Sequence, residues 1–165
     1  FVDIAKEGFD AGIRLGESLD NDMIGVRIGA DLEMIVAGAP DYFRDHSPPK
    51  TPHDLTGHNC INLRMPTLGA PYVWEFEKEA RPLNVRVAGQ FTCSDSELIV
   101  DAALAGRGLV CLPSDHLGPH VDGGRLIRVL ADWCPPFAGY HLYYPSRRQV
   151  TSAFRLLVDG LRYSD

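Results

Sequence analysis

The stretch from Cys93 to Pro113 constrains the fold of this chain more than any other part. It joins a polar loop, a segment with apolar residues at helical spacing, and a short apolar run. Ser94 and Glu97 have the S-x-x-E form of a capping box, in which each side chain satisfies a backbone N–H at a helix start. We therefore expect a helix that begins at Ser94 and ends at the Gly106–Gly108 turn. The apolar run at 109–112 predicts a buried parallel strand.

The start of this expected helix is the first candidate binding site. Unpaired N–H groups and the helix dipole favour negative charge at a helix N-terminus. Thr92, Ser94 and Asp95 are the polar side chains around that start. We expect them to form one wall of a ligand cleft, and the alternative is that Ser94 and Asp95 act only as helix caps.

Two arginines follow expected strands and strengthen the case for an anion. Arg14 is near the end of an apolar run at 9–15, and Arg64 comes directly after another at 60–63. Strand ends in an α/β sheet face the binding crevice, and the guanidinium fork matches the two oxygens of a carboxylate. The alternative for each arginine is a surface salt bridge. Together with the helix start, they predict a small organic anion as the ligand.

Strands and helices alternate along the chain, so we expect an α/β protein. Breaks near 37–40 and 133–139, both rich in Pro or Gly, divide it into two pieces. Residues 1–38 and 137–165 would form one lobe, and residues 39–136 the other. Two crossover strands would join the lobes, and the cleft between them would hold the ligand.

Composition and charge exclude several classes of function. The net charge of −6 over 165 residues argues against a nucleic-acid footprint on this chain. No apolar run approaches the roughly 20 residues that span a bilayer. The four cysteines show no C-x-x-C spacing, which favours reduced structural thiols and a cytoplasmic location.

The sequence offers no convincing metal or catalytic site. His53, His58 and Cys60 lack the paired spacing that is usual for zinc. His116 and His120 are four residues apart, but we expect Pro119 to interrupt the helix and leave both exposed. There is no G-x-S-x-G motif and no carboxylate pair suited to acid–base catalysis. We expect no catalytic residue, metal or cofactor.

Four groups of motifs stand in a recognisable order. They are Phe1-Val2-Asp3-Ile4 with Glu7-Gly8-Phe9-Asp10-Ala11-Gly12-Ile13-Arg14-Leu15-Gly16-Glu17, His53-Asp54-Leu55 with His58-Asn59-Cys60-Ile61, Ala105-Gly106-Arg107-Gly108-Leu109 with Pro113, and Tyr143-Tyr144-Pro145-Ser146-Arg147-Arg148. In this order they resemble the C-terminal effector-binding domain of LysR-type transcriptional regulators.

The resemblance implies a periplasmic-binding-protein-like (type 2) pair of α/β lobes, here with the first lobe incomplete. It implies that a small-molecule effector binds between the lobes, with contacts at Arg14, Leu15 and Gly16 and from Thr92 to Asp95. It also implies a homodimer or homotetramer that binds promoter DNA through a winged helix-turn-helix absent from this chain. The alternatives are a solute-binding receptor or an enzyme on the same fold.

Overall fold

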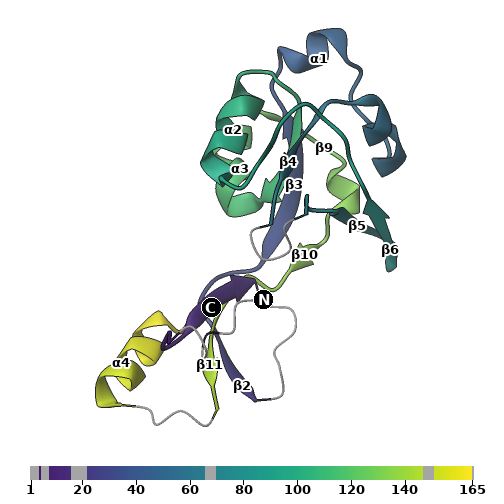
Figure 1. Ribbon diagram of the computed structural model, residues 1–165. Coiled ribbons are helices and arrows are strands. Elements are labelled where there is room, and N and C mark those ends of the chain that lie inside the picture. Colours follow the sequence, from purple (N-terminus) through teal and green to yellow (C-terminus); the bar gives the residue numbers. More distant parts are fainter. Residues whose placement is uncertain (1–3, 5–7, 16–21, 66–69, 147–150, 165) are drawn as a thin grey trace. The chain divides into compact units, whose positions relative to one another are not determined.

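The structure, a computed structural model, describes residues 4, 8–15, 22–65, 70–146 and 151–164 (Figure 1). The chain divides into two compact units. Unit 1 comprises Phe1–Leu32 and Pro136–Asp165, and unit 2 comprises Glu33–Pro135. The sequence placed the corresponding breaks after Gly38 and after Pro136. That the two units are the regulatory lobes of the resemblance stays a prediction.

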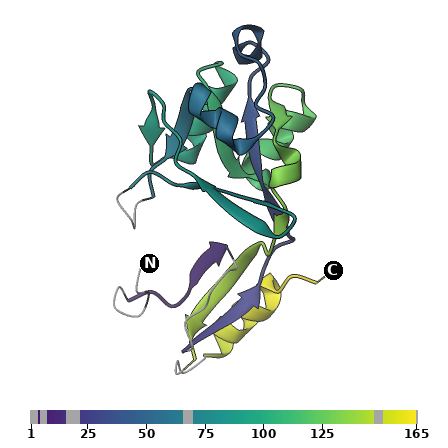
Figure 2. The same ribbon diagram turned by 90° about the vertical axis from the view of Figure 1, so that its right-hand side faces the viewer.

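Unit 1 is a three-stranded antiparallel sheet with a helix packed against it (Figure 2). The strand order is β1-β11-β2, and the elements are β1 (Gly12–Leu15), β2 (Met23–Arg27), β11 (Tyr140–Pro145) and α4 (Ser152–Leu161). The apolar runs at 9–15, 24–28 and 140–144 predict the three strands, and Thr151 before a helical apolar pattern predicts α4; all four are confirmed to within three residues at each end. Thr151 caps α4, since its hydroxyl accepts a hydrogen bond from the Phe154 N–H at 3.2 Å. Phe154 and Val158 then pack on Leu142 and the core of the sheet.

Unit 2 contains a mixed sheet of six strands, of which β10 is formed by the first two residues of the second segment of unit 1. The strand order is β10-β3-β8-β4-β7, with β9 also paired to β3. The strands are β3 (Leu32–Gly38), β4 (Cys60–Leu63), β7 (Thr92–Cys93), β8 (Leu109–Pro113), β9 (Ile127–Val129) and β10 (Pro136–Phe137). β8 runs parallel to β4, with Cys60 opposite Leu109, so the predicted parallel strand is confirmed. β7 is also parallel to β4, whereas β3 is antiparallel to β8.

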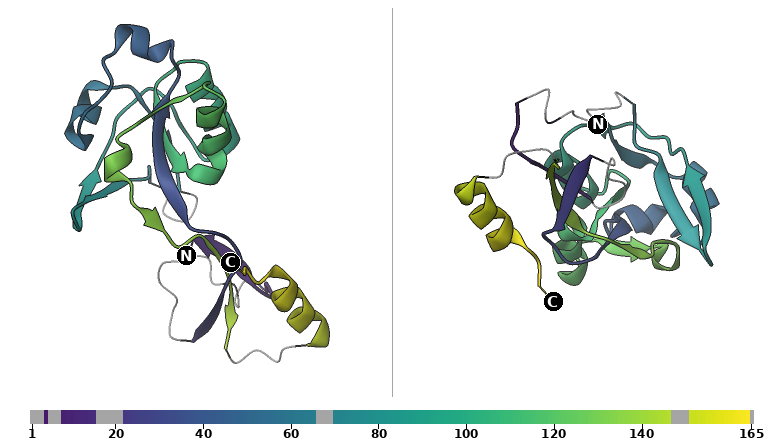
Figure 3. Two further views of the ribbon diagram at one scale, coloured as in Figure 1. Left: turned by 180° about the vertical axis from the view of Figure 1, so that it is seen from behind. Right: turned by 90° about the horizontal axis from the view of Figure 1, so that it is seen from below.

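Alternating side chains on these strands supply two separate cores, one on each face of the sheet. On one face, Ile35, Ile61 and Val110 pack with α2 (Ser96–Leu104) and α3 (Ser114–Asp122). On the other face, Val36, Cys60 and Leu109 pack with the remaining elements of the unit. These are α1 (Tyr42–Asp45), η1 (Pro52–Gly57), η2 (Ala131–Trp133) and the β5 (Trp74–Lys78)–β6 (Arg81–Val85) hairpin. Figure 3 shows the two sets of elements on opposite sides of the sheet.

Apolar and polar residues alternate at 72–77 and 83–87 around a turn at 78–82, which predicts a hairpin, and β5 and β6 confirm it with a shorter turn. β5 and β6 pair antiparallel from Trp74 opposite Val85 to Lys78 opposite Arg81. The turn residues Glu79 and Ala80 have φ values of 53° and 58°. Two consecutive residues with positive φ match the right-handed twist of a two-residue hairpin.

The expected break at Pro119 is wrong, because α3 continues through it to Asp122. A proline disfavours helix at the preceding residue chiefly through a clash with that residue's Cβ and N–H. Here the preceding residue is Gly118, which has no Cβ to clash with the proline ring. His116 and His120 therefore lie on one continuous helix, and both are half-buried rather than exposed.

Candidate functional site

The parallel ends of β4 and β7 bring three of the predicted residues together. Asn62 lies opposite Thr92, and Leu63 opposite Cys93. The Arg64 N–H then donates to the Cys93 carbonyl oxygen at 2.7 Å, which ties the residue after β4 to the residue before Ser94. Parallel strands end at the same edge of a sheet, so Arg64, Thr92 and Ser94 share one edge, and all three are exposed.

The N-terminus of α2 lies directly behind this edge, and its cap differs from the predicted one. The cap is Asp95, whose carboxylate accepts the N–H groups of Glu97 at 2.9 Å and Leu98 at 3.3 Å. Ser94 precedes the cap, so the predicted Ser94–Glu97 capping box is wrong. Aspartate and serine are equally good N-caps, and the aspartate charge also faces the positive end of the helix dipole.

This cap changes what the helix start offers to a ligand. Two N–H groups of the first turn of α2 already bind the Asp95 carboxylate, which also carries a negative charge. The Asp95 N–H is directed to the Cys93 sulfur at 3.4 Å. The start of α2 therefore offers fewer unpaired N–H groups than the sequence predicts, and Arg64 is a cationic residue at the same edge.

The remaining predicted contacts belong to unit 1. Arg14 and Leu15 lie on β1 opposite His141 and Tyr140, and the Arg14 guanidinium is 4.2 Å from the centre of the Tyr143 ring. Gly16 lies outside the described residues. The structure therefore brings Arg64, Thr92, Ser94 and Asp95 together in unit 2, and it places Arg14 and Leu15 on a different sheet.

The cysteines have the properties of core residues. All four are free, and three of them are buried in one apolar cluster of unit 2. Burial raises the pKa of Cys60 to about 12 and that of Cys134 to about 11, and it raises the pKa of Cys111 well above its usual value. A thiol that stays protonated is a poor nucleophile and a poor metal ligand.

The ranges that the structure describes hold neither a metal-binding cluster nor a membrane-spanning helix. There, no group of three or more His, Cys, Asp and Glu side chains could hold a metal ion. His58, one of the histidines considered for a metal, is instead 3.0 Å from the Tyr42 hydroxyl through its Nδ1. No helix in the same ranges is long and apolar enough to cross a membrane.

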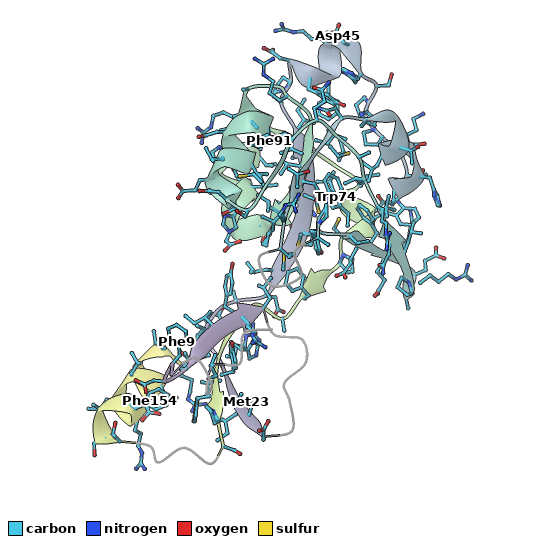
Figure 4. All side chains as sticks on the ribbon, viewed as in Figure 1. Phe9, Met23, Asp45, Trp74, Phe91 and Phe154 are labelled. Atoms are coloured by element: carbon cyan, nitrogen blue, oxygen red, sulfur yellow. The ribbon has the colours of Figure 1, made fainter. Side chains whose placement is uncertain are left out.

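One residue of this region was missed by sequence reasoning. Asn62 lies inside β4, and its side chain is bonded to Tyr72, Trp74 and Leu63. The signal in the sequence was an amide side chain in the otherwise apolar run Cys60-Ile61-Asn62-Leu63. Figure 4 shows its partner Trp74 in the interior of unit 2.

Comparisons with known proteins agree along the whole chain. The family model of the LysR substrate binding domain matches residues 1–164. A Pseudomonas aeruginosa relative described as a transcriptional regulator is 53% identical over 164 residues, which are 99% of this chain and 54% of that protein. The Escherichia coli HTH-type transcriptional regulator PgrR is 45% identical over 98% of this chain and 54% of its own length. The chain thus spans about half the length of the curated relatives it matches.

Solved structures give the same result for the fold. CrgA, a LysR-type transcriptional regulator from Neisseria meningitidis, superposes with a TM-score of 0.77 at 25% identity, over 96% of this chain and 53% of CrgA. The regulatory domain of CrgA alone gives a TM-score of 0.73 at 24% identity, over 96% of this chain and 76% of that domain. The fold is therefore the α/β, type 2 periplasmic-binding-protein-like fold of LysR regulatory domains. With the family match over residues 1–164, this shows that the chain belongs to the family of LysR substrate-binding domains.

Proposed function

We propose that this chain is the effector-sensing domain of a bacterial transcription regulator and that its effector is a small organic anion. The observation that carries the proposal is the position of Arg64. Its backbone is tied to Cys93 by a 2.7 Å hydrogen bond, so an exposed arginine follows β4 at the sheet edge that also carries Thr92 and Ser94. A guanidinium binds both oxygens of a carboxylate, and hydroxyls can bind its other polar groups.

The remaining parts of the proposal concern the longer protein. Its relatives are about twice as long as this chain and are named as transcriptional regulators, one of them of the HTH type. We infer that DNA binding belongs to a region outside this chain, which itself carries a net charge of −6. A homodimer or homotetramer in the cytoplasm, with no catalytic activity in this domain, completes the proposal.

Thermal unfolding with matched pairs of small molecules tests the charge and the role of Arg64. Acetate, succinate and benzoate are compared with acetamide, succinamide and benzamide, which have similar shapes and no charge. A ligand that binds only the folded chain stabilises it by about 2.7 kcal/mol at 100 times its Kd, so a binding acid raises Tm. We expect at least one acid, and none of the amides, to raise it.

Two arginine variants locate the site. Arg64→Ala should abolish the shift in Tm. Arg86→Ala is the matched control: Arg86 is also exposed, but it lies just after the hairpin and away from β7, so this variant should keep the shift. An equal shift in both variants would place the anion elsewhere. If no acid in the panel raises the Tm of the unaltered chain, the choice of small carboxylates as effectors is wrong.

A further inference from the structure

Asn62 differs from every other buried residue in the part of the chain that the structure describes. Its relative exposure is 5%, and it is the one polar side chain in the buried set. It lies in β4, two residues before Arg64, between the apolar residues Ile61 and Leu63. Burying an amide is costly unless its hydrogen bonds are satisfied, so the partners of Asn62 indicate why it is there.

The partners of Asn62 fix the orientation of its side chain. Its Oδ1 atom accepts the Trp74 indole N–H at 3.2 Å and the Leu63 backbone N–H at 2.9 Å. Its Nδ2 atom donates to the Tyr72 carbonyl oxygen at 3.1 Å. An indole N–H and a backbone N–H can only donate and a carbonyl can only accept, so the amide fits in this orientation alone.

These bonds hold the segment 70–74 against the end of β4. The Tyr72 N–H donates back to the Leu63 carbonyl oxygen at 2.7 Å, and the Met65 N–H donates to the Ala70 carbonyl oxygen at 3.2 Å. The backbone of Arg64 forms an isolated antiparallel β-bridge with Pro71. Arg64 is therefore flanked by β7 on one side and by the segment 70–74 on the other.

We propose that Asn62 is a positioning residue for Arg64: by anchoring the segment 70–74, it fixes the direction in which the guanidinium leaves the sheet. The effect of Asn62 on ligand binding rests on the proposed function. The effect of Asn62 on the backbone of Arg64 does not. If this core position needed only to be filled, an apolar side chain would do so without burying a polar group. The buried amide is therefore explained by the hydrogen bonds that it makes. The bond that carries this role is the one from Nδ2 to the Tyr72 carbonyl oxygen, because the Tyr72 N–H is itself bonded to Leu63, the residue before Arg64. The bond from the Trp74 indole instead reaches the first residue of β5.

Amide hydrogen exchange, measured by NMR on the 165-residue chain, tests the positioning directly. Asn62→Ser removes the bond to Tyr72 with a small polar replacement, and Asn62→Ala removes every side-chain bond. We expect exchange at the Arg64 and Tyr72 amides to rise by about tenfold in both variants, relative to the amide of Gly123, which caps the end of α3. Trp74→Phe is the matched control, because it removes the indole donor and leaves the bond between Asn62 and Tyr72.

The control separates positioning from general stability. In Trp74→Phe, exchange at Arg64 should change no more than exchange at Gly123. If all three variants accelerate the amides of unit 2 uniformly, Asn62 contributes only to stability and the proposal is wrong. Asn62→Ser keeps the test available even where Asn62→Ala fails to fold.

Calorimetric titration with benzoate and succinate adds the functional measurement. Asn62→Ser should weaken binding about tenfold at a temperature well below its Tm, and Trp74→Phe should bind as the unaltered chain does. Unchanged affinity in Asn62→Ser would overturn the positioning role. If neither acid binds the unaltered chain, the choice of anion has failed, and hydrogen exchange at Arg64 still decides the role of Asn62.

Discussion

Asp95 and Ser94 are neighbours of similar capping ability, and the structure gives them different roles. Asp95 has extended backbone angles (φ −109°, ψ 117°) and binds two N–H groups of the first turn of α2, whereas Ser94 lies one residue outside. We therefore expect Asp95→Ala to lower the free energy of unfolding by about 1 kcal/mol, the usual value of an N-cap. Ser94→Ala should change it by less than about 0.5 kcal/mol. Urea unfolding monitored by circular dichroism measures both.

A third variant separates capping from charge at this position. Asn is as good an N-cap as Asp, so Asp95→Asn should keep most of the stability that Asp95→Ala loses. A Ser94→Ala variant as unstable as Asp95→Ala would contradict the assignment of the cap. The sequence could predict this helix start only to within one residue, because both side chains fit the pattern and only the backbone angles distinguish them.

At the scale of elements, a Tyr–His contact joins α1 to the end of η1. The Tyr42 hydroxyl accepts the Asn59 N–H at 3.2 Å, and its own hydrogen is then available to His58 Nδ1 at 3.0 Å. His46 stacks on the Tyr42 ring, with 4.2 Å between ring centres. Burial, and next the neighbouring His46, lower the pKa of His58 from its ordinary 6.5, and Asp54 opposes this. The lowered pKa favours neutral His58, whose Nδ1 can accept the Tyr42 hydroxyl hydrogen.

This contact predicts a loss of stability in mild acid. Because the pKa of His58 is lower in the folded chain than in the unfolded chain, its protonation favours unfolding. The contribution of His58 is complete above a pH of about 6.5 and is lost as pH falls toward its lower folded-state pKa. Urea midpoints measured between about pH 7.5 and about pH 5.5 should fall accordingly.

Two glutamine variants identify the titrating group. His58→Gln should remove most of this pH dependence, since glutamine does not titrate and its carbonyl can still accept the Tyr42 hydroxyl. His53→Gln, at an exposed position of η1, should keep it. The same slope in His58→Gln as in the unaltered chain would assign the effect to another group.

The elements that the sequence predicted well are those with a strong local signal. β4 was predicted at its observed bounds from its apolar run, and Gly106 and Gly108 have φ values of 69° and 156° that favour glycine at the end of α2. The errors arose where two local rules compete. At Pro119 the helix-breaking rule failed because Gly118 relieves the clash, and at Asn62 the apolar pattern hid a polar side chain whose partners are distant in sequence.

At the scale of the molecule, the sequence signalled two pieces with a first break after Gly38, and the two compact units divide earlier in the chain. Gly38 and Pro40 mark the end of β3, whereas the change of unit falls between Leu32 and Glu33, at the start of that strand. A continuous strand carries no turn residue where the unit changes, so composition alone cannot locate the division. The candidate site shows the same limit: Arg64 and Ser94 are thirty residues apart in sequence and meet only through strand pairing.

The separate cores predict that the two units differ in local stability. Among the described residues, unit 1 has one apolar cluster between its sheet and α4, whereas unit 2 has a cluster on each face of its sheet. Buried apolar area sets the free energy of local opening, so amides of β3 and β8 should exchange more slowly than amides of β2 and β11.

Matched valine variants test this independence. Val158 in α4 and Val110 in β8 are both buried, and truncation to alanine at either should lower the local free energy of unfolding by about 2 kcal/mol. Val158→Ala should accelerate exchange in β2 and β11 and leave β3 and β8 unchanged, and Val110→Ala should do the reverse. Acceleration of all four strands in either variant would mean that one cooperative transition unfolds both cores. If exchange accelerates only in the unit that carries the substitution, each core is stabilised by its own apolar cluster.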